Sequence, residues 1–292
     1  MFFDGFTLDT VDCGEVSLRV RHGGSGPPVV LLHGHPRTHA TWHRVAALLA
    51  DRHTVICSDL RGYGRSTVPP DEPDHAQASK RAMANDVVSL MDALGHERFA
   101  VAGHDRGAYA AFQTAMGHPD RVVALTTMGR GVPLIEAVTR IDGRFARDWW
   151  HWFFLGQTDK PAEDVIAAIG PDAWYVPHGP EVMGPEAHED LWTALRDPAV
   201  VHGMCEDYRA GLAIDVEHAE ADRAAGRRIR CPVQSLWAAR EDAGLFGDDP
   251  LELWRGWADD LRGAEIDSGH HMAEEAPEET AAALAAFWAE VV

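Results

Sequence analysis

The chain has 292 residues, 46% of them hydrophobic, and its 46 acidic and 26 basic residues give a formal net charge of -20. This length is enough for one large core with an inserted subdomain. The negative charge argues against nucleic acids and anionic membrane surfaces as partners, because both attract lysine and arginine, and no apolar stretch approaches the ~20 residues that span a bilayer.

The cysteines and the first residues indicate the compartment. The four cysteines are scattered and form no C-x-x-C pair, which is typical of reduced thiols. Met1–Asp4 lack a basic segment followed by a long apolar run, so we expect no signal peptide. The sequence therefore predicts a cytoplasmic protein that acts on a small molecule without a cofactor, and leaves a homodimer open as its assembly.

Short apolar runs alternate with longer amphipathic ones in the first half of the chain. Predicted strands cover residues 16–21, 29–32, 53–58, 99–102 and 121–128, and predicted helices cover residues 41–50, 82–94 and 108–117. Runs such as 29–32 are apolar throughout, as expected of a strand that is buried on both faces. The alternation predicts the fold class α/β, with a doubly wound, mostly parallel sheet.

One short segment carries most of the chemical information. Gly103-His104-Asp105-Arg106-Gly107 lies between the predicted strand 99–102 and the predicted helix 108–117. A Gly-x-nucleophile-x-Gly turn in this context is the nucleophile elbow of the α/β-hydrolase fold, where the glycines permit a sharp turn. The central residue is a carboxylate rather than a serine. Asp105 is therefore the predicted nucleophile, suited to displacement at a saturated carbon through an ester intermediate.

The middle of the chain has a different character. From about residue 131 to 228 strand-like runs are missing, and tryptophans, acids and helical periodicity dominate. Strand character returns at 232–237, and a last helix is predicted over 277–291. We expect a core formed by residues 1–131 and 229–292, with a helical cap, residues 132–228, inserted into it.

Hydrolysis of an ester intermediate requires a base and an acid that orients it. His270, in Gly269-His270-His271, follows the expected final strand and is the predicted base, with His271 as the rival. No carboxylate follows the strand after the elbow. We therefore predict Asp242, in the loop after strand 232–237, as the orienting acid, while Glu241, Asp248 and Asp249 stay open as alternatives.

The remaining candidate site residues are hydrogen-bond donors to the oxyanion or to the leaving group. The backbone N–H groups of His35 and Arg106 are predicted to form the oxyanion hole. His151, Trp152 and Tyr208 in the cap are predicted to hold a leaving halide or an epoxide oxygen, because their N–H and O–H groups can donate to it. Four early histidines are spaced too loosely for a metal site, and no metal is predicted. They are His33, His35, His39 and His43.

These segments together resemble the fluoroacetate/haloacetate dehalogenases, which neighbour the epoxide hydrolases of the α/β-hydrolase fold. The resemblance covers nearly the whole chain. It rests on the segments 33–37, 59–64, 103–107, 151–152, 204–211, 269–270 and 274–279. It implies Asp105 as nucleophile, His270 as base, His151, Trp152 and Tyr208 as halide ligands, and Arg106 as partner of the substrate carboxylate.

The chain departs from this family pattern at two positions. A second carboxylate-binding arginine is expected one helical turn after Arg106, where this chain has Tyr109. The family also keeps its acid after the strand that follows the elbow, where this chain has Gly129. The first departure removes half of a carboxylate clamp and predicts that Tyr109 lines a pocket for a larger, less charged substrate.

The predicted activity is hydrolytic dehalogenation of a 2-haloacid such as haloacetate, through an alkyl-enzyme ester. The main alternative is hydrolysis of an epoxide, in which Tyr208 and His151 donate to the ring oxygen. A non-catalytic small-molecule receptor on the same fold is the third hypothesis. Serine-esterase chemistry is disfavoured by the elbow aspartate, and haloalkane dehalogenation by Arg106, where those enzymes resemble one another in having tryptophan.

Overall fold

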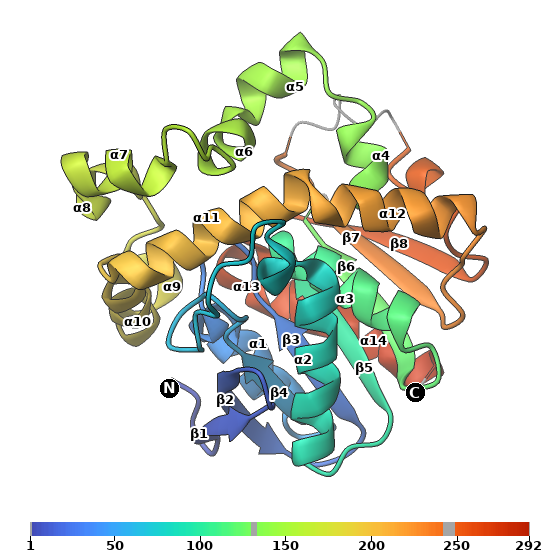
Figure 1. Ribbon diagram of the computed structural model, residues 1–292. Coiled ribbons are helices and arrows are strands. Elements are labelled where there is room, and N and C mark those ends of the chain that lie inside the picture. Colours follow the sequence, from blue (N-terminus) through green and yellow to red (C-terminus); the bar gives the residue numbers. More distant parts are fainter. Residues whose placement is uncertain (1, 130–132, 242–248, 292) are drawn as a thin grey trace.

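The computed structural model describes residues 2–129, 133–241 and 249–291, which form a central sheet covered by helices (Figure 1). Eight strands pair in the order β1-β2-β4-β3-β5-β6-β7-β8. They are β1 (Thr7–Asp12), β2 (Ser17–Gly24), β3 (Pro28–Leu32), β4 (Thr54–Ser58), β5 (Phe99–His104), β6 (Val122–Met128), β7 (Val233–Ala238) and β8 (Leu261–Ile266). Only the pairs β1–β2 and β2–β4 are antiparallel and the other five are parallel, so the predicted α/β class and mostly parallel sheet are confirmed.

The helices fall into two groups. Those of the core are η1 (His39–Trp42), α1 (His43–Leu49), η2 (Ala76–Ala78), α2 (Lys80–Ala93), α3 (Arg106–Gly117), η4 (Glu252–Trp254), α13 (Met272–Glu275) and α14 (Pro277–Val291). Those between β6 and β7 are α4 (Leu134–Val138), α5 (Gly143–Asp148), α6 (Trp150–Leu155), α7 (Ala162–Ile169), α8 (Pro171–Trp174), α9 (Pro180–Met183), α10 (Pro185–Leu195), α11 (Pro198–Leu212) and α12 (Ile214–Ala224). In Figure 1 the second group lies across one end of the sheet.

Strand β5, which leads into the elbow, lies inside the sheet between β3 and β6. All six of its residues are buried, because helices cover both faces of a parallel sheet. Parallel strands present their carboxyl ends at one edge, so the loops after β3, β5, β6 and β7 meet there. This edge is where the inserted helices lie, and it places the predicted site beneath them.

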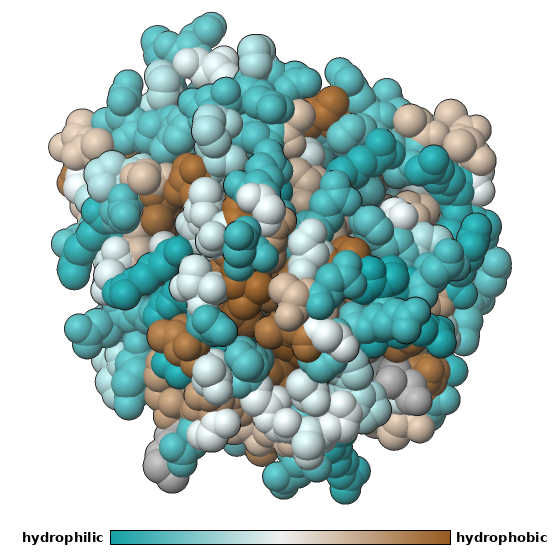
Figure 2. Space-filling view, turned by 60° about the horizontal axis from the view of Figure 1, so that its bottom comes forward, coloured by the Kyte–Doolittle hydropathy of each residue, from teal (hydrophilic) through white to brown (hydrophobic). Residues whose placement is uncertain are grey.

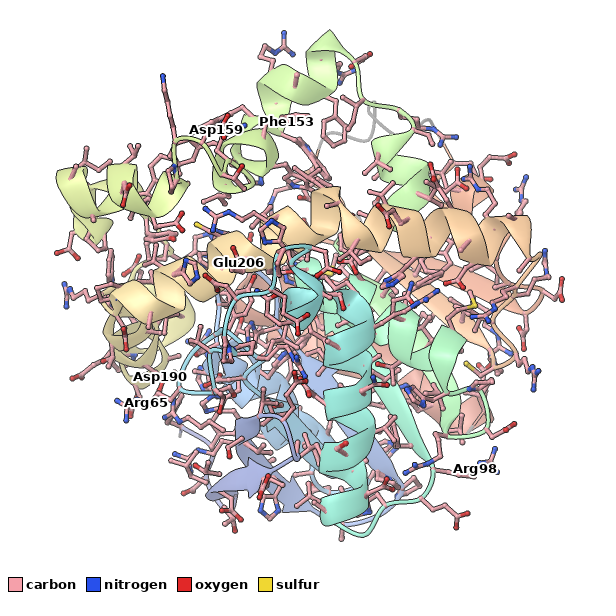
Figure 3. All side chains as sticks on the ribbon, in the orientation of Figure 1. Arg65, Arg98, Phe153, Asp159, Asp190 and Glu206 are labelled. Carbon is pink, nitrogen blue, oxygen red and sulfur yellow. The ribbon has the colours of Figure 1, made fainter. Side chains whose placement is uncertain are left out.

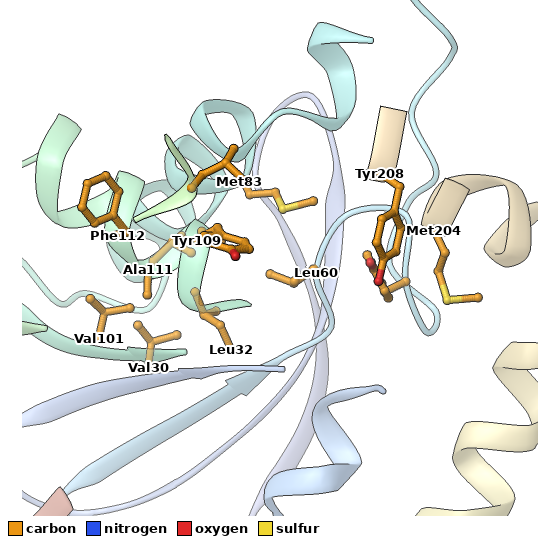
Figure 4. Close-up of a cluster of buried hydrophobic side chains, with 14 of the residues drawn as sticks. Val30, Leu32, Leu60, Met83, Val101, Tyr109, Ala111, Phe112, Met204 and Tyr208 are labelled. Atoms are coloured by element: carbon orange, nitrogen blue, oxygen red, sulfur yellow. The ribbon is translucent and has the colours of Figure 1, made fainter. Parts of the chain in front are cut away.

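Apolar side chains of the cap and of the sheet belong to one cluster. Leu32 and Val101 come from strands, Tyr109 from α3, and Met204 and Tyr208 from α11 (Figure 4). Figure 4 shows Tyr109 among core side chains, with Tyr208 descending from the cap helix on the other side of Leu60. The cap is thus packed into the core rather than attached by a linker alone.

Polar contacts join the same two parts. On the cap, Asp190 accepts hydrogen bonds from Arg19 (2.6 Å) and Thr38 (2.7 Å) of the core. Glu206 of α11 accepts one from Gln77 (2.7 Å), and both acids are labelled in Figure 3. Partly buried, charge-assisted contacts of this kind fix the orientation of two packed layers.

The surface is mainly hydrophilic. Figure 2 shows one face on which polar side chains predominate and apolar ones gather near the middle. Within the described residues, no helix combines the length and the apolar character that a bilayer crossing requires.

Candidate active site

Asp105 lies at a sharp turn between β5 and α3. Its backbone has φ 52° and ψ -120°, a conformation that a non-glycine residue adopts only at a cost in free energy. The flanking glycines are required by close packing, since a Cβ on Gly103 would lie 2.1 Å from the Gly107 carbonyl oxygen, and one on Gly107 would lie 2.3 Å from that of His33. The elbow predicted from the sequence thus presents the Asp105 side chain above the sheet.

Backbone N–H groups hold one side of the Asp105 carboxylate. The His35 N–H, in the loop after β3, donates to Oδ1 at 2.8 Å, and the Arg106 N–H is a second hydrogen-bond donor to the carboxylate. Burial alone would raise the pKa of Asp105, but the charge of His270, the neighbouring His104 and these donors outweigh it and lower the pKa. Asp105 is therefore ionised at neutral pH, with Oδ1 held by the His35 N–H, one of the two predicted oxyanion donors.

His270 lies on the other side of the carboxylate. Its Nε2 is 3.8 Å from Asp105 Oδ2, and its Nδ1 is 2.7 Å from Glu241 Oε1. Burial would lower the pKa of His270, but the hydrogen bond with Glu241 and the charges of Asp105 and Glu241 raise it overall. The predicted acid, Asp242, lies outside the described residues. Among the described residues, the carboxylate hydrogen-bonded to His270 Nδ1 is that of its neighbour, Glu241.

The loop after β6, where the resembling family keeps its acid, is also close to His270. Gly129 has φ 78°, and a Cβ there would lie 3.3 Å from His104 Nε2 and 3.8 Å from His270 Cε1. A side chain at position 129 would therefore need a strained backbone and a shift of His104. The space that a carboxylate would use here is taken by an imidazole.

His104 and His271 form a second layer around the predicted base. His104 Nε2–H donates to the His270 carbonyl oxygen at 2.7 Å, and burial lowers the pKa of His104 to about 4, so its ring is neutral. Burial also places the pKa of His271 well below its usual value. These neutral rings fix the backbone of His270 without competing for its proton.

The three predicted leaving-group donors face one another under the cap. The Tyr208 ring centroid is 6.1 Å from that of His151 and 6.4 Å from that of Trp152. Burial keeps the pKa of Tyr208 high and lowers that of His151, so both side chains are neutral donors. Among the described residues no hydrogen bond is formed by the side chain of any of the three, which leaves their side-chain N–H and O–H groups available to a ligand.

Arg106 is engaged in a way that the sequence did not indicate. Its Nε and Nη2 donate to the two Asp207 carboxylate oxygens at 3.0 and 2.8 Å, and Nη2 also donates to the Asp207 carbonyl oxygen at 2.6 Å. The guanidinium carbon lies 4.2 Å from the centroid of the Tyr208 ring. The Nε–Nη2 edge of the guanidinium, which could bind a substrate carboxylate through two hydrogen bonds, is thus occupied by Asp207. Among the described residues, Nη1 is the guanidinium nitrogen without a hydrogen-bond partner.

Tyr109, predicted to line the substrate pocket, is 6% exposed and packs edge-to-face on Trp152 at 6.2 Å. It also borders a small internal cavity together with Lys80 and Asp215. Burial raises its pKa, so the phenol stays protonated. Tyr109 therefore contacts the leaving-group donors from below, on the face of α3 that also carries Arg106.

A pocket of about 430 Å³ opens between the core loop after β3 and the cap. Two of its lining residues, His35 and His151, belong to the candidate site. Leu155, Tyr175 and His178 line it farther out. The pocket thus borders the candidate site and has room for groups larger than an acetate unit.

Within the part of the chain that the structure describes, two groups of side chains have ligand atoms close enough to share a metal ion. One is His104, His270 and His271, and the other is Asp71, His202 and Glu206. The first contains the histidine that is hydrogen-bonded to Glu241. In the second, His202 binds Asp71 directly at 2.8 Å, so atoms that could ligate a metal already have protein partners in each group. The early histidines point to separate partners, such as Asp59 for His39.

Residues 27–277 match the family model described as alpha/beta hydrolase fold. The chain belongs to the α/β-hydrolase family. This hydrolase is 40% identical to fluoroacetate dehalogenase from Burkholderia sp over 98% of its own length and 94% of the relative's. It is 30% identical to soluble epoxide hydrolase from Corynebacterium sp. (strain C12) over 87% of both chains. Among solved structures, ALR0039 from Nostoc sp PCC 7120 superposes with a TM-score of 0.93 at 40% identity, covering 98% of this chain and 99% of that one.

These matches confirm the resemblance found in the sequence and identify the hydrolase as an enzyme whose relatives include a dehalogenase and epoxide hydrolases. Sequence reasoning missed two residues around the site. Lys80 and Asp207 gave no local signal beyond the cap segment that contains Tyr208. Glu241 was considered, but only as an alternative to its neighbour.

Proposed function

We propose that the hydrolase attacks a saturated carbon with Asp105 and then hydrolyses the resulting ester with His270, oriented by Glu241. The observation that supports this best is that the two oxygens of the Asp105 carboxylate have different neighbours. Oδ1 accepts from the His35 N–H at 2.8 Å, while Oδ2 lies 3.8 Å from His270 Nε2. One oxygen is held as the future oxyanion and the other is left to attack.

In the first step, Asp105 Oδ2 forms a bond to the carbon that carries the leaving group, and the bond from that carbon to halide breaks with its electron pair. The halide is received by the N–H and O–H groups of His151, Trp152 and Tyr208. Because these are neutral donors in a buried site, they stabilise the developing negative charge more strongly than water would.

In the second step, water attacks the Asp105 carboxyl carbon and gives a proton to His270 Nε2. The tetrahedral intermediate carries its negative charge on Oδ1, where the His35 and Arg106 N–H groups donate. Its collapse releases the alcohol, which takes the proton back from His270, and leaves Asp105 with one oxygen from water. Alkylation removes the Asp105 charge, one of the causes that raise the pKa of His270, so the imidazole becomes a free base when it is needed.

For the substrate we propose a 2-haloacid. The relative with 40% identity is named fluoroacetate dehalogenase, and Arg106 directly follows the nucleophile. Arg37 does not complete a clamp, because it donates to both Glu274 oxygens, at 2.6 and 3.1 Å. With one arginine of the pair replaced by Tyr109, we expect weak binding of haloacetate and tolerance of larger haloacids in the pocket beside His151.

Epoxide hydrolysis is the second candidate. The observation that favours it is the pair of neutral donors, His151 and Tyr208, whose rings are 6.1 Å apart on the cap side of the site. An epoxide oxygen needs a proton donor there when Asp105 opens the ring. An epoxide also needs no carboxylate partner, which suits an Arg106 already paired with Asp207.

A trapping experiment tests both candidates. His270→Ala should allow alkylation, which needs no base, and prevent hydrolysis. After exposure to chloroacetate, mass spectrometry of the Asp105 peptide should show an added carboxymethyl group. After exposure to styrene oxide, it should show an increase by the mass of the whole epoxide. Absence of an adduct from any haloacid or epoxide, together with no turnover by the unaltered protein, would support the receptor hypothesis instead.

A further inference from the structure

We propose that Lys80, buried beneath the cap, determines the preference of the active site for an anionic substrate by offsetting the charge of Asp207. This inference rests on the proposed 2-haloacid dehalogenation. It assigns to Lys80 a positioning role that acts through Asp207 and Arg106, without contact to the substrate.

The three charged side chains form one buried chain of contacts. Lys80 is the first residue of α2, and its Nζ contacts Asp207 Oδ1 on α11. The same Oδ1 accepts from Arg106 Nη2 at 2.8 Å. The side chains of Lys80, Asp207 and Arg106 are 2%, 0% and 1% exposed, so water screens their charges little.

Two cations therefore share one carboxylate. The second Asp207 oxygen, Oδ2, accepts from Arg106 Nε at 3.0 Å and from the neutral Tyr63 hydroxyl at 2.6 Å. Without Lys80, Arg106 and Asp207 would form a pair of zero net charge. With Lys80 in its charged form the three side chains carry one net positive charge, although burial and the neighbouring Arg106 lower the pKa of Lys80.

Asp215 is the other acid at this cluster. Its Oδ1 accepts from the Lys80 backbone N–H at 2.8 Å rather than from the ammonium group. Burial is the main cause that raises the pKa of Asp215, which favours its neutral form. Asp215 therefore offsets the positive charge less than an ionised acid would.

The positive charge is directed at the reaction site through Arg106. Its guanidinium lies against the Tyr208 ring at 4.2 Å and near the Trp152 ring at 5.7 Å, and both side chains are proposed halide donors. Arg106 also follows Asp105 in the chain and donates its backbone N–H to that carboxylate. Because the charge of Lys80 offsets that of Asp207, the positive charge of Arg106 is not neutralised. A substrate carboxylate that enters this space is attracted by the resulting positive potential.

A purely structural role for Lys80 gives a different expectation. Lys80 joins α2 to α11, so its loss could loosen the cap and reduce every activity alike. Substrates of the same shape but different charge separate the two cases. Chloroacetate is an anion, and chloroacetamide is its neutral counterpart.

The test compares Lys80→Met with the unaltered protein in steady-state turnover of both compounds to glycolate and glycolamide. We expect KM for chloroacetate to rise on the order of tenfold, the size expected from one weakly screened charge, and KM for chloroacetamide to change by less than about twofold. Lys80→Gln, whose amide still reaches Asp207, should show the same selective change if Lys80→Met does not fold. Lys160→Met alters an exposed cap lysine and is the matched control.

The outcomes separate this inference from the proposed function. If the unaltered protein prefers chloroacetate and both Lys80 variants keep that preference, or lose both activities in parallel, the role of Lys80 is overturned while the proposed function stands. If the unaltered protein acts on neither compound, or on chloroacetamide alone, the 2-haloacid proposal fails and this inference fails with it.

Discussion

Glu241 and His270, separated by 28 residues in the sequence, are joined by a 2.7 Å contact between Oε1 and Nδ1. The contact orients the imidazole so that its Nε2 faces Asp105. An acid in this place fixes the tautomer of a catalytic histidine and stabilises its charged form. This contact is the basis for proposing Glu241 as the orienting acid, while the predicted acid, Asp242, lies outside the described residues and stays a prediction.

Glu241→Gln should slow hydrolysis of the ester by roughly 10²–10⁴-fold and leave alkylation of Asp105 largely unchanged, because only the second step needs the base. Rapid quenching followed by mass spectrometry of the Asp105 peptide measures both steps. Asp242→Asn is the matched control and should behave like the unaltered protein. The reverse result would return the role to Asp242.

The two steps should respond differently to pH. The lowered pKa of Asp105 keeps the nucleophile ionised in mildly acidic solution, while His270 must be neutral to accept a proton from water. Lowering the pH from 7 to 5 should therefore leave the alkylation burst intact and slow the release of product. Single-turnover quenching should show the ester accumulating at pH 5. Equal slowing of both steps would contradict the assignment of His270 as base for the second step alone.

Tyr109→Arg should lower KM for chloroacetate by roughly 10- to 100-fold, because a charge-assisted hydrogen bond is worth about 1.5–3 kcal/mol. Neutral epoxides should be turned over less well, since they gain nothing from the added cation. Steady-state kinetics on both substrate classes tests this. Tyr109→Phe, which removes only the hydroxyl, is the control. Unchanged KM values in Tyr109→Arg would show that position 109 does not face the substrate.

His202 should make stability depend on pH. Hydrogen bonding to Glu163 is the main cause that raises the pKa of His202 to about 9, and Asp71 binds its other nitrogen. A folded-state pKa above the unfolded value of about 6.5 stabilises the fold fully below that value. The contribution is lost as the pH rises through about 9.

Thermal unfolding at pH 6 and pH 9.5 measures this effect. Tm should fall over that interval, and His202→Gln should reduce the fall by removing the titrating group. His188→Gln is a control on α10, where the histidine accepts from Trp192 within its own helix. An identical fall of Tm in the His202 variant would exclude the contact as its source.

The elements that sequence analysis located best are those whose signals are local. The elbow and the helix Pro277–Val291 were predicted closely because glycine spacing and apolar periodicity lie within a few neighbouring residues. The edge strand β1 was missed because five of its six residues are exposed, so it shows little apolar alternation. The predicted helix 41–50 begins instead as the 3₁₀ turn η1, which Thr38 caps.

The candidate site was predictable where one residue type at one place suffices, as for Asp105 and His270. The partner of Arg106 was not, because its pairing with Asp207 depends on how closely α11 approaches α3 across 101 positions of sequence. The choice between Glu241 and Asp242 could not be made from the sequence for a smaller reason. Neighbouring residues in a loop point in different directions, and spacing alone cannot tell which one faces the histidine.

Two adjacent residues of α11 have separate tasks: Asp207 holds Arg106, and the Tyr208 ring lies against that guanidinium near His151 and Trp152. Selection for a new substrate could therefore change both properties through substitutions in the single helix α11. Exchanging that helix between a haloacid dehalogenase and an epoxide hydrolase would transfer two properties in one segment. These are the charge preference set by position 207 and the leaving-group donor at position 208. Laboratory evolution that randomises positions 200–211 alone would sample both properties while leaving Asp105, His270 and Glu241 in place.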